Sequence, residues 1–417
     1  MPARRHLAAL ALLALALPAC AGPAWQGVYD GVLGNARVIV ALGPGYSRYA
    51  YLAKANDLGL IATEAGGGLQ IAETIAPGIG ADDIKANGKL VTGHWTLKQQ
   101  GEKLTGRWTD AAGGRARAIS LTRVSRKADS GEDAPGGNPA GAYGARWLAA
   151  AAPFAQQGGE ATSGPLAYTL LRDPHYGNTV PHLTRAAPGV RLEAVNKQLE
   201  NLLGALVLRD RNCMQDLRSS TALSDPASLA EIERPPRKAV AASQESIKPV
   251  FATAGLLVLL ETRSQFCGGA HSANTVSAFT FDLQSPRQIT GLGEGSDDLA
   301  PSALGAAFDF ADTGKRTRFD SLWVERFRAA VAREAKVHGA DEVATACGAD
   351  LGGQLEQGGA GIDRIVYPLK EGLAIRATGF GHATSICASD YAANPLVLPW
   401  AEVKPFLKAG QKLLPGG

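Results

Sequence analysis

The sequence T-G-H-W at residues 92–95 returns as T-G-R-W at residues 105–108, with a Gln100-Gly101 turn between the two. Two strands joined by a short turn pair side by side in opposite directions. We therefore expect an antiparallel hairpin in which Trp95 and Trp108 lie on matching faces. Such a hairpin predicts a β-sheet for the first part of the chain.

Further strand patterns surround this hairpin. Residues 37–42 are mostly apolar, and alternating patterns occur at residues 47–51 and 116–124. Short strands that follow one another closely are typical of an antiparallel meander or a small barrel. We expect residues 24–125 to form a small all-β domain of this type. Its tryptophans are expected in the core, and stacking on a sugar is the alternative.

A second domain is predicted after a linker. Residues 126–141 are charged and rich in Gly and Pro, which indicates a flexible linker, and residues 142–410 mix helical and strand patterns. One helix is expected to begin after Pro188-Gly189 and to end before Cys213. The polar residues 218–245 are expected to form a long surface excursion.

The other predicted elements of this domain are a second helix and several strands. The helix covers residues 320–338, with Leu322, Trp323, Phe327 and Val331 on its buried side. Residues 249–262 are predicted to form a buried strand pair or one long strand, and further strands are predicted at residues 275–283, 364–369, 374–380 and 395–398. Helices on an antiparallel sheet make residues 142–410 an α+β domain.

Residues 258–292 contain the most specific pattern of the chain. After the strand pattern of residues 249–262 comes Arg263-Ser264-Gln265-Phe266-Cys267-Gly268-Gly269-Ala270-His271, and a strand with F-T-F-D-L at residues 279–283 follows. This order resembles the extracytoplasmic domain shared by the lysozyme-sensing anti-sigma factor RsiV and the peptidoglycan deacetylase PdaC. The resemblance extends over most of residues 160–408, and its specific part is the G-G-A-H hairpin.

The resemblance implies a module that binds a cell-wall glycan or a wall-acting protein such as lysozyme. The chain lacks the cytoplasmic segment and membrane span of the anti-sigma factors, and it lacks the Asp and His metal set of the deacetylases. We therefore expect a non-enzymatic binding module for peptidoglycan or a lysozyme-like protein. Its predicted ligand-binding residues are Gly268, Gly269, Ala270 and His271.

Other interpretations of this hairpin stay open. The glycines and His271 can have a purely structural role, with the histidine bonded to a neighbouring strand. A cell-wall glycan hydrolase or deacetylase would use His271 with Glu261, Asp282 or Glu371, although Asp282 is expected to cap a turn. A structural envelope scaffold is the third alternative. Phe266 is expected in the core.

The N-terminus predicts export. Arg4 and Arg5 precede an apolar run, and Leu17-Pro18-Ala19-Cys20 ends it, as in a signal peptide over residues 1–19. The ending resembles the lipobox of bacterial lipoproteins, which implies acylation of Cys20, with palmitate as the expected modification. Cleavage after Ala21 would instead give a soluble periplasmic protein.

Location and charge follow from this signal. Removing residues 1–19 takes away Arg4 and Arg5, which lowers the formal net charge from +3 to +1. We expect no nucleic-acid partner, because no basic run remains. In a Gram-negative cell, Ala21-Gly22 lacks the Asp that retains lipoproteins at the inner membrane. The expected location is therefore the outer membrane, facing the periplasm.

Four cysteines remain after Cys20, and an even number in an exported chain predicts disulfides. Their order favours the pairs Cys213–Cys267 and Cys347–Cys387. A zinc site is the alternative, but the chain has no C-x-x-C spacing. Its candidate ligands, His175, His182, His271, His382, Asp173 and Glu261, match no metal motif. We expect neither a metal nor a cofactor.

Overall fold

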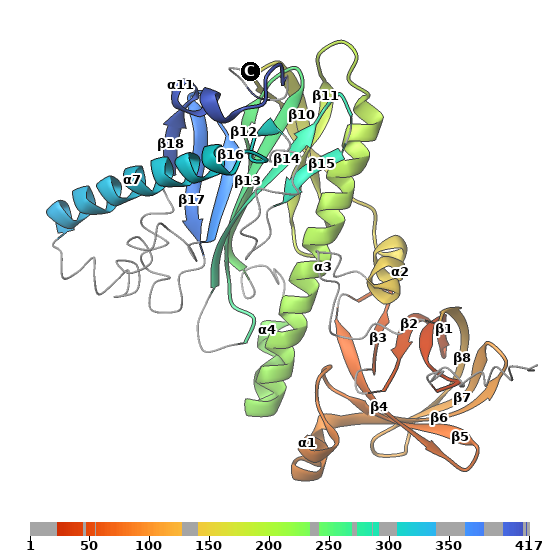
Figure 1. Ribbon diagram of the computed structural model, residues 1–417. Coiled ribbons are helices and arrows are strands. Elements are labelled where there is room, and N and C mark those ends of the chain that lie inside the picture. The colour runs from red at the N-terminus through yellow and green to blue at the C-terminus, as the bar shows by residue number, and fades with distance from the viewer. Residues whose placement is uncertain are drawn as a thin grey trace, which may run out of the picture.

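The computed structural model describes residues 23–44, 47–54, 56–126, 141–233, 242–268, 273–285, 287–291, 307–338, 363–378, 395–411 and residue 414. The chain begins with an eight-stranded antiparallel barrel and continues as antiparallel sheets with helices, so the whole is mixed α+β (Figure 1). The expected β-rich first part and α+β second part are confirmed at this level. The predicted signal peptide lies outside the described residues, as does residue range 127–140 of the predicted linker.

The barrel closes through strands that are neighbours in sequence. They are β1 (Gly27–Leu33), β2 (Ala36–Leu42), β3 (Ser47–Tyr51), β4 (Asp57–Ala65), β5 (Gly68–Thr74), β6 (Val91–Gln100), β7 (Lys103–Asp110) and β8 (Ala116–Ser125). β8 pairs with β1, which closes the barrel. A helix, α1 (Ala81–Ala86), and a short 3-10 turn, Gly88–Leu90, lie between β5 and β6.

The repeated T-G-x-W phrase pairs as the sequence predicts. Trp95 on β6 lies opposite Trp108 on β7, and both side chains are buried in the barrel core. Gly93 precedes them for a steric reason, because a Cβ at this position would come within 2.4 Å of the Trp108 Nε1 atom. The repeated motif therefore places two indole rings in the core, and Gly93 leaves the space that the Trp108 ring occupies.

The described residues of the second part form three small antiparallel sheets with helices packed against them. α2 (Ala142–Ala150) precedes the sheet of β9 (Ala155–Ser163), β10 (Leu166–Arg172) and β11 (Thr179–Arg185). The long helix α3 (Leu192–Ser224) and the short α4 (Leu229–Ile232) follow. A four-stranded sheet then contains β12 (Ala242–Ala252), β13 (Leu256–Gln265), β14 (Ala273–Asp282) and β15 (Arg287–Gly291).

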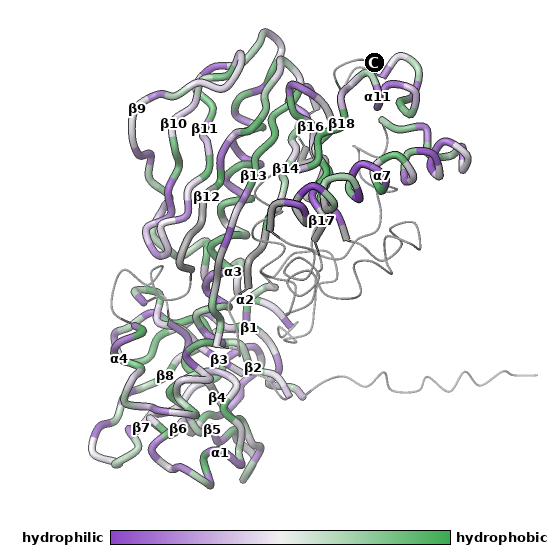
Figure 2. Tube along the Cα trace, turned by 90° about the vertical axis from the view of Figure 1, so that its left-hand side faces the viewer, coloured by the Kyte–Doolittle hydropathy of each residue, from purple (hydrophilic) through white to green (hydrophobic). Residues whose placement is uncertain are grey.

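The last elements are α7 (Thr313–His338), the sheet of β16 (Asp363–Pro368), β17 (Gly372–Thr378) and β18 (Leu396–Pro399), and the short helix α11 (Trp400–Val403). Along α7, apolar and polar residues alternate (Figure 2). Trp323 is fully buried on its inner side, while Leu322 and Phe327 are half-buried against the same core. This confirms the predicted stripe for the three residues whose side chains are described.

β13 is apolar on both faces because it has a core on each side. Leu257 and Leu259 belong to the core that α3 covers, together with Phe279 and Phe281 of β14. Leu256 and Val258 point the other way, into the core shared with α7 and the β16–β18 sheet. A continuous apolar run is what a strand buried on both faces requires.

The predicted end of the long helix was wrong. α3 runs through Cys213 to Ser224, and β12 already begins at Ala242, so residues 218–245 are not one surface excursion. The cause is the barrel. Arg211, Gln215 and Arg218 are buried because this half of α3 packs against the barrel (Figure 1), so their polarity does not indicate exposure to solvent.

Candidate functional site

β13 and β14 position the loop that the sequence singled out. The two strands pair without interruption from Leu256–Asp282 to Gln265–Ala273, so residues 266–272 connect them as a hairpin. Phe266, Cys267 and Gly268 belong to the described residues, whereas Gly269, Ala270 and His271 lie outside them. The expected pair of strands around this loop is confirmed.

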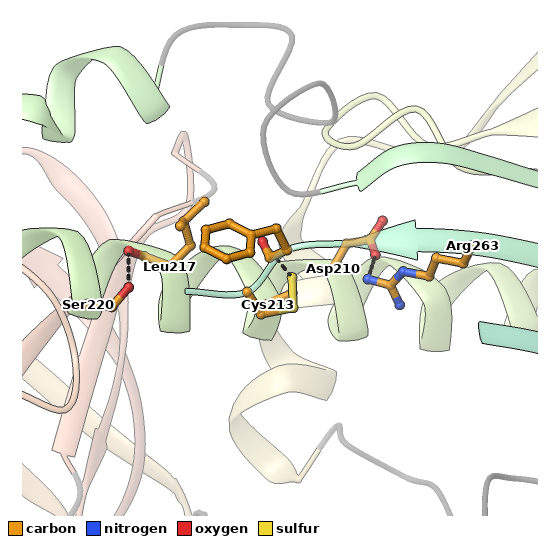
Figure 3. Close-up of a disulfide and its surroundings, with 7 residues drawn as sticks. Asp210, Cys213, Leu217, Ser220 and Arg263 are labelled. Atoms are coloured by element: carbon orange, nitrogen blue, oxygen red, sulfur yellow. Dashed lines mark hydrogen bonds and ion pairs between the residues drawn. A yellow bond between two sulfur atoms is a disulfide. The ribbon is translucent and has the colours of Figure 1, made fainter. Parts of the chain in front are cut away.

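A disulfide ties the loop to α3. Cys267 is bonded to Cys213 of the helix, with an S–S distance of 2.10 Å and a Cα–Cα distance of 4.7 Å. Figure 3 shows Asp210, Cys213, Leu217 and Ser220 following one another along α3 beside this bond. The predicted pair Cys213–Cys267 is confirmed. Cys20 and the predicted pair Cys347–Cys387 lie outside the described residues.

Gly268 brings the loop backbone directly onto the helix. Its φ angle is +88°, and a Cβ at this position would lie 2.2 Å from the Ser220 Oγ atom. It would also lie 3.1 Å from the backbone of Asp216 and of Leu217. The glycine is therefore needed for both its conformation and its lack of a side chain. This close backbone approach is made to α3 of the same chain.

Phe266 is not in the core, contrary to the prediction. Its side chain is 37% exposed, because it follows the last paired residue of β13 and precedes the cysteine that is drawn onto α3. The loop therefore presents an aromatic ring next to a backbone that is fixed at two points.

Two ion pairs, one buried and one partly buried, join β13 to α3. Glu261 and Arg263 are two residues apart on β13 and so lie on one face of the strand, the face toward α3. Arg209 donates to the Glu261 carboxylate at 3.0 Å, and Arg263 pairs with Asp210 at 2.5 Å. Opposite charges on strand and helix thus neutralise each other in pairs.

Contacts within the protein occupy two of the three candidate catalytic carboxylates. Glu261 is fully buried against Arg209. Asp282 accepts hydrogen bonds from the backbone N–H groups of Gln284 and Ser285 at 2.9 and 3.1 Å, so it caps the turn as predicted. Glu371 is exposed at the turn between β16 and β17, in a different sheet.

Two of the candidate histidine ligands, His175 and His182, take part in structural contacts. The His182 ring lies 3.3 Å from the Asn196 amide, which also bonds both backbone groups of Leu183. The His175 ring lies beside Trp147, with 5.3 Å between ring centroids. Among the described residues, no three His, Cys, Asp or Glu side chains are grouped in a way that suits a metal ion. His271 and His382 lie outside them.

The tryptophans of the barrel surround a carboxylate that the sequence analysis did not single out. Glu73 is 3% exposed, and its Oε2 atom accepts hydrogen bonds from Trp95 and Trp108 at 2.8 Å and from Tyr49 at 2.9 Å. Thr92 donates to the other oxygen at 2.7 Å. Burial, reinforced by the charge of Glu73, raises the pKa of Tyr49, so this phenol stays protonated as a donor.

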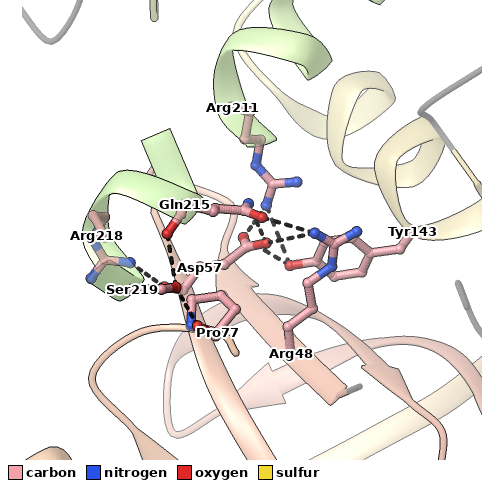
Figure 4. A network of polar contacts seen from close by, with 8 residues as sticks. All are labelled: Arg48, Asp57, Pro77, Tyr143, Arg211, Gln215, Arg218 and Ser219. Atoms are coloured by element: carbon pink, nitrogen blue, oxygen red, sulfur yellow. Dashed lines mark hydrogen bonds and ion pairs between the residues drawn. The ribbon is translucent and has the colours of Figure 1, made fainter. Parts of the chain in front are cut away.

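A second missed cluster joins the barrel to the helices (Figure 4). Asp57 of β4 is fully buried and accepts from Tyr143 of α2 at 2.9 Å and from Gln215 of α3 at 2.5 Å, and it pairs with Arg211. Burial, with a further contribution from Asp57, raises the pKa of Tyr143. The cluster holds α3, and with it the hairpin loop, in a fixed position on the barrel.

No helix in the described part of the chain combines the length and the apolar character needed to cross a membrane. A comparison with known protein families finds no match to the chain, and a comparison with curated proteins finds none either.

Proposed function

We propose that this chain is an exported bacterial envelope lipoprotein, acylated at Cys20, whose α+β part is a non-enzymatic binding module for peptidoglycan or a lysozyme-like protein. The G-G-A-H resemblance at residues 268–271 and the signal pattern at residues 1–20 support the proposal. The disulfide agrees with export, because disulfides persist in oxidising compartments. A lipid anchor would hold the module at the outer membrane, facing the periplasm.

The observation that carries the proposal is the attachment of Cys267 and Gly268 to α3. The disulfide and the Gly268 contact hold the first residues of the loop on α3, while Phe266 stays exposed. Backbone that is held in place before binding, as at Cys267 and Gly268, loses little conformational freedom when a ligand arrives. Exposed aromatic side chains often contribute much of the binding free energy at interfaces. The loop therefore has the properties of a recognition element.

Binding is favoured over hydrolysis by the state of the carboxylates. A glycoside hydrolase needs two carboxyl groups that face each other across the sugar. Glu261 is neutralised by Arg209 and shielded from solvent, and Asp282 is used in a turn. A hydrolase or deacetylase that uses His271 would have to recruit other groups. A structural scaffold is the remaining alternative, and it predicts no affinity for wall glycan or lysozyme.

The test is calorimetry of the oxidised mature chain, residues 22–417, with lysozyme and with purified peptidoglycan. We expect saturable binding to one of them, and a loss of about tenfold in affinity in Phe266→Ala, as is usual for an exposed aromatic at an interface. His271→Ala is expected to lower the affinity for the same ligand.

The matched control is Leu223→Ala, because Leu223 is also an exposed apolar residue, on α3 and outside the loop. It should leave the affinity unchanged. Absence of binding to both ligands would remove the proposal. Release of sugar or acetate that His271→Ala abolishes would replace it by the enzymatic alternative.

A further inference from the structure

Three cations form a group on the outer face of the barrel. Lys98 of β6 lies opposite Thr105 of β7, so Lys103 and Arg107 are its two diagonal neighbours on the same face. Diagonal neighbours in an antiparallel pair are about 7–8 Å apart. All three side chains are exposed. We call Lys98, Lys103 and Arg107 the basic patch.

The surroundings of the basic patch do not neutralise it. Among the ion pairs of the described residues, none includes any of the three cations. The exposed residues opposite or beside them on β5, β6, β7 and β8 are uncharged, namely Gln70, Thr96, Thr105, Ala118, Ser120 and Thr122. Like charges brought together without a counter-charge lower stability, so such a group is expected to have an external anionic partner.

The acidic residue nearest in sequence is already occupied. Glu102 lies in the turn between β6 and β7 and pairs with Arg123 at 3.0 Å and also with Arg126. Two arginines on one carboxylate leave this end of the barrel positively charged. Hydroxyl groups next to unpaired cations suit phosphate oxygens, which accept hydrogen bonds and carry negative charge.

The basic patch lies next to the point where the chain would leave the membrane. The Ala24 carbonyl accepts a hydrogen bond from Gln99 at 2.9 Å, and it also accepts one from Arg123. Gln99 is the neighbour of Lys98 on β6. Cys20 is four residues before Ala24, and a chain of this length reaches at most about 14 Å. An acyl group on Cys20 therefore keeps the turn between β6 and β7 close to the bilayer.

We propose that the basic patch is a docking surface for the phosphate groups of the anionic membrane leaflet in which Cys20 is anchored. This inference rests on the lipid anchor in the proposed function. The short tether and the pairing of Glu102 with two arginines point to the same occupant. The contact would turn the barrel side toward the bilayer and hold the molecule in one orientation on the membrane.

The test uses the mature chain without its acyl group, residues 22–417, and vesicles that contain phosphatidylglycerol or phosphatidylcholine alone. We expect co-sedimentation with the phosphatidylglycerol vesicles, weaker at high salt because screening reduces the attraction. A basic residue near an anionic surface contributes about fivefold in affinity, so the combined Lys98→Gln, Lys103→Gln and Arg107→Gln variant should bind about a hundredfold more weakly.

The control variant removes three exposed lysines at the opposite end of the barrel, through Lys54→Gln, Lys85→Gln and Lys89→Gln. It has the same change in net charge and should bind like the unmodified chain. Equal binding of the two variants, or no preference for phosphatidylglycerol, would overturn the inference. The proposed function is judged separately by palmitate incorporation at Cys20 and by calorimetry with wall ligands, neither of which requires the basic patch.

Discussion

At the scale of single residues, Glu73 shows how a buried carboxylate organises the barrel core. Its two oxygens accept four hydrogen bonds, three of them from aromatic side chains. Without this acceptor, two indole N–H groups would be buried without a partner, and the Tyr49 phenol would keep only a 3.5 Å contact with the Tyr51 hydroxyl. Leaving buried donors unsatisfied costs more than an ordinary hydrogen bond contributes.

We expect Glu73→Ala to lower the free energy of unfolding by about 3–5 kcal/mol, because several buried donors lose their acceptor and a cavity is left. Glu73→Gln keeps one oxygen and the shape, and its cost is expected to be about 1–2 kcal/mol. Urea unfolding followed by tryptophan fluorescence measures both. Glu64→Gln is the control, since Glu64 also accepts an indole N–H, that of Trp25, but at an exposed position. A control as damaging as Glu73→Gln would contradict the argument.

The sequence predicted the two tryptophans of this core but not the glutamate. Leu69, Ile71 and Glu73 alternate along β5, which places Glu73 on the inward face. The signal was therefore present in the spacing. It is a weak signal, because a carboxylate is rarely buried unless it is paired, and its partners come from β3, β6 and β7.

At the scale of elements, the β13–β14 hairpin and α3 depend on each other. The hairpin strands were predictable from local sequence patterns. The Cys213–Cys267 bond was predictable from the order of the cysteines along the chain. The true length of α3 was not, because its second half is polar toward the barrel. A helix that contacts polar groups of another part of the chain does not show an apolar stripe over its full length.

We expect Gly268→Ala to destabilise the protein by about 2–4 kcal/mol, since it adds a Cβ against α3 and also a side chain at positive φ. Gly66→Ala is the matched control. Gly66 has a φ of +57°, but a Cβ there would meet nothing within 4 Å, so the substitution carries only the conformational cost of about 1–2 kcal/mol. Chemical denaturation of the oxidised protein measures both. Equal losses would show that the loop does not lie on the helix.

At the scale of the whole molecule, the barrel and the α+β part are joined through α3 and α2. Apolar residues of β1, β2 and β3 on the outside of the barrel pack against Cys213, Met214 and Leu217, and the Asp57 cluster adds polar contacts to this interface. No sequence pattern indicated this association, because the partners are far apart in the sequence, from 86 residues for Tyr143 and Asp57 to 158 residues for Gln215 and Asp57. The predicted flexible linker had indicated two domains that do not hold each other in place.

The Asp57 cluster makes this association sensitive to one residue. Asp57→Ala leaves Arg211 buried without its carboxylate, which is expected to cost about 3–5 kcal/mol. Because the loss falls on the interface, we expect the barrel and the α+β part to unfold at different urea concentrations in this variant and together in the unmodified chain. Tryptophan fluorescence and far-UV circular dichroism, recorded on the same samples, distinguish the two cases.

Asp30→Ala is the control, since Asp30 pairs with Arg146 of α2 at the exposed edge of the same interface and such pairs contribute less than about 1 kcal/mol. If Asp30→Ala separated the transitions as well, the interface would depend on its total charge and not on the buried cluster.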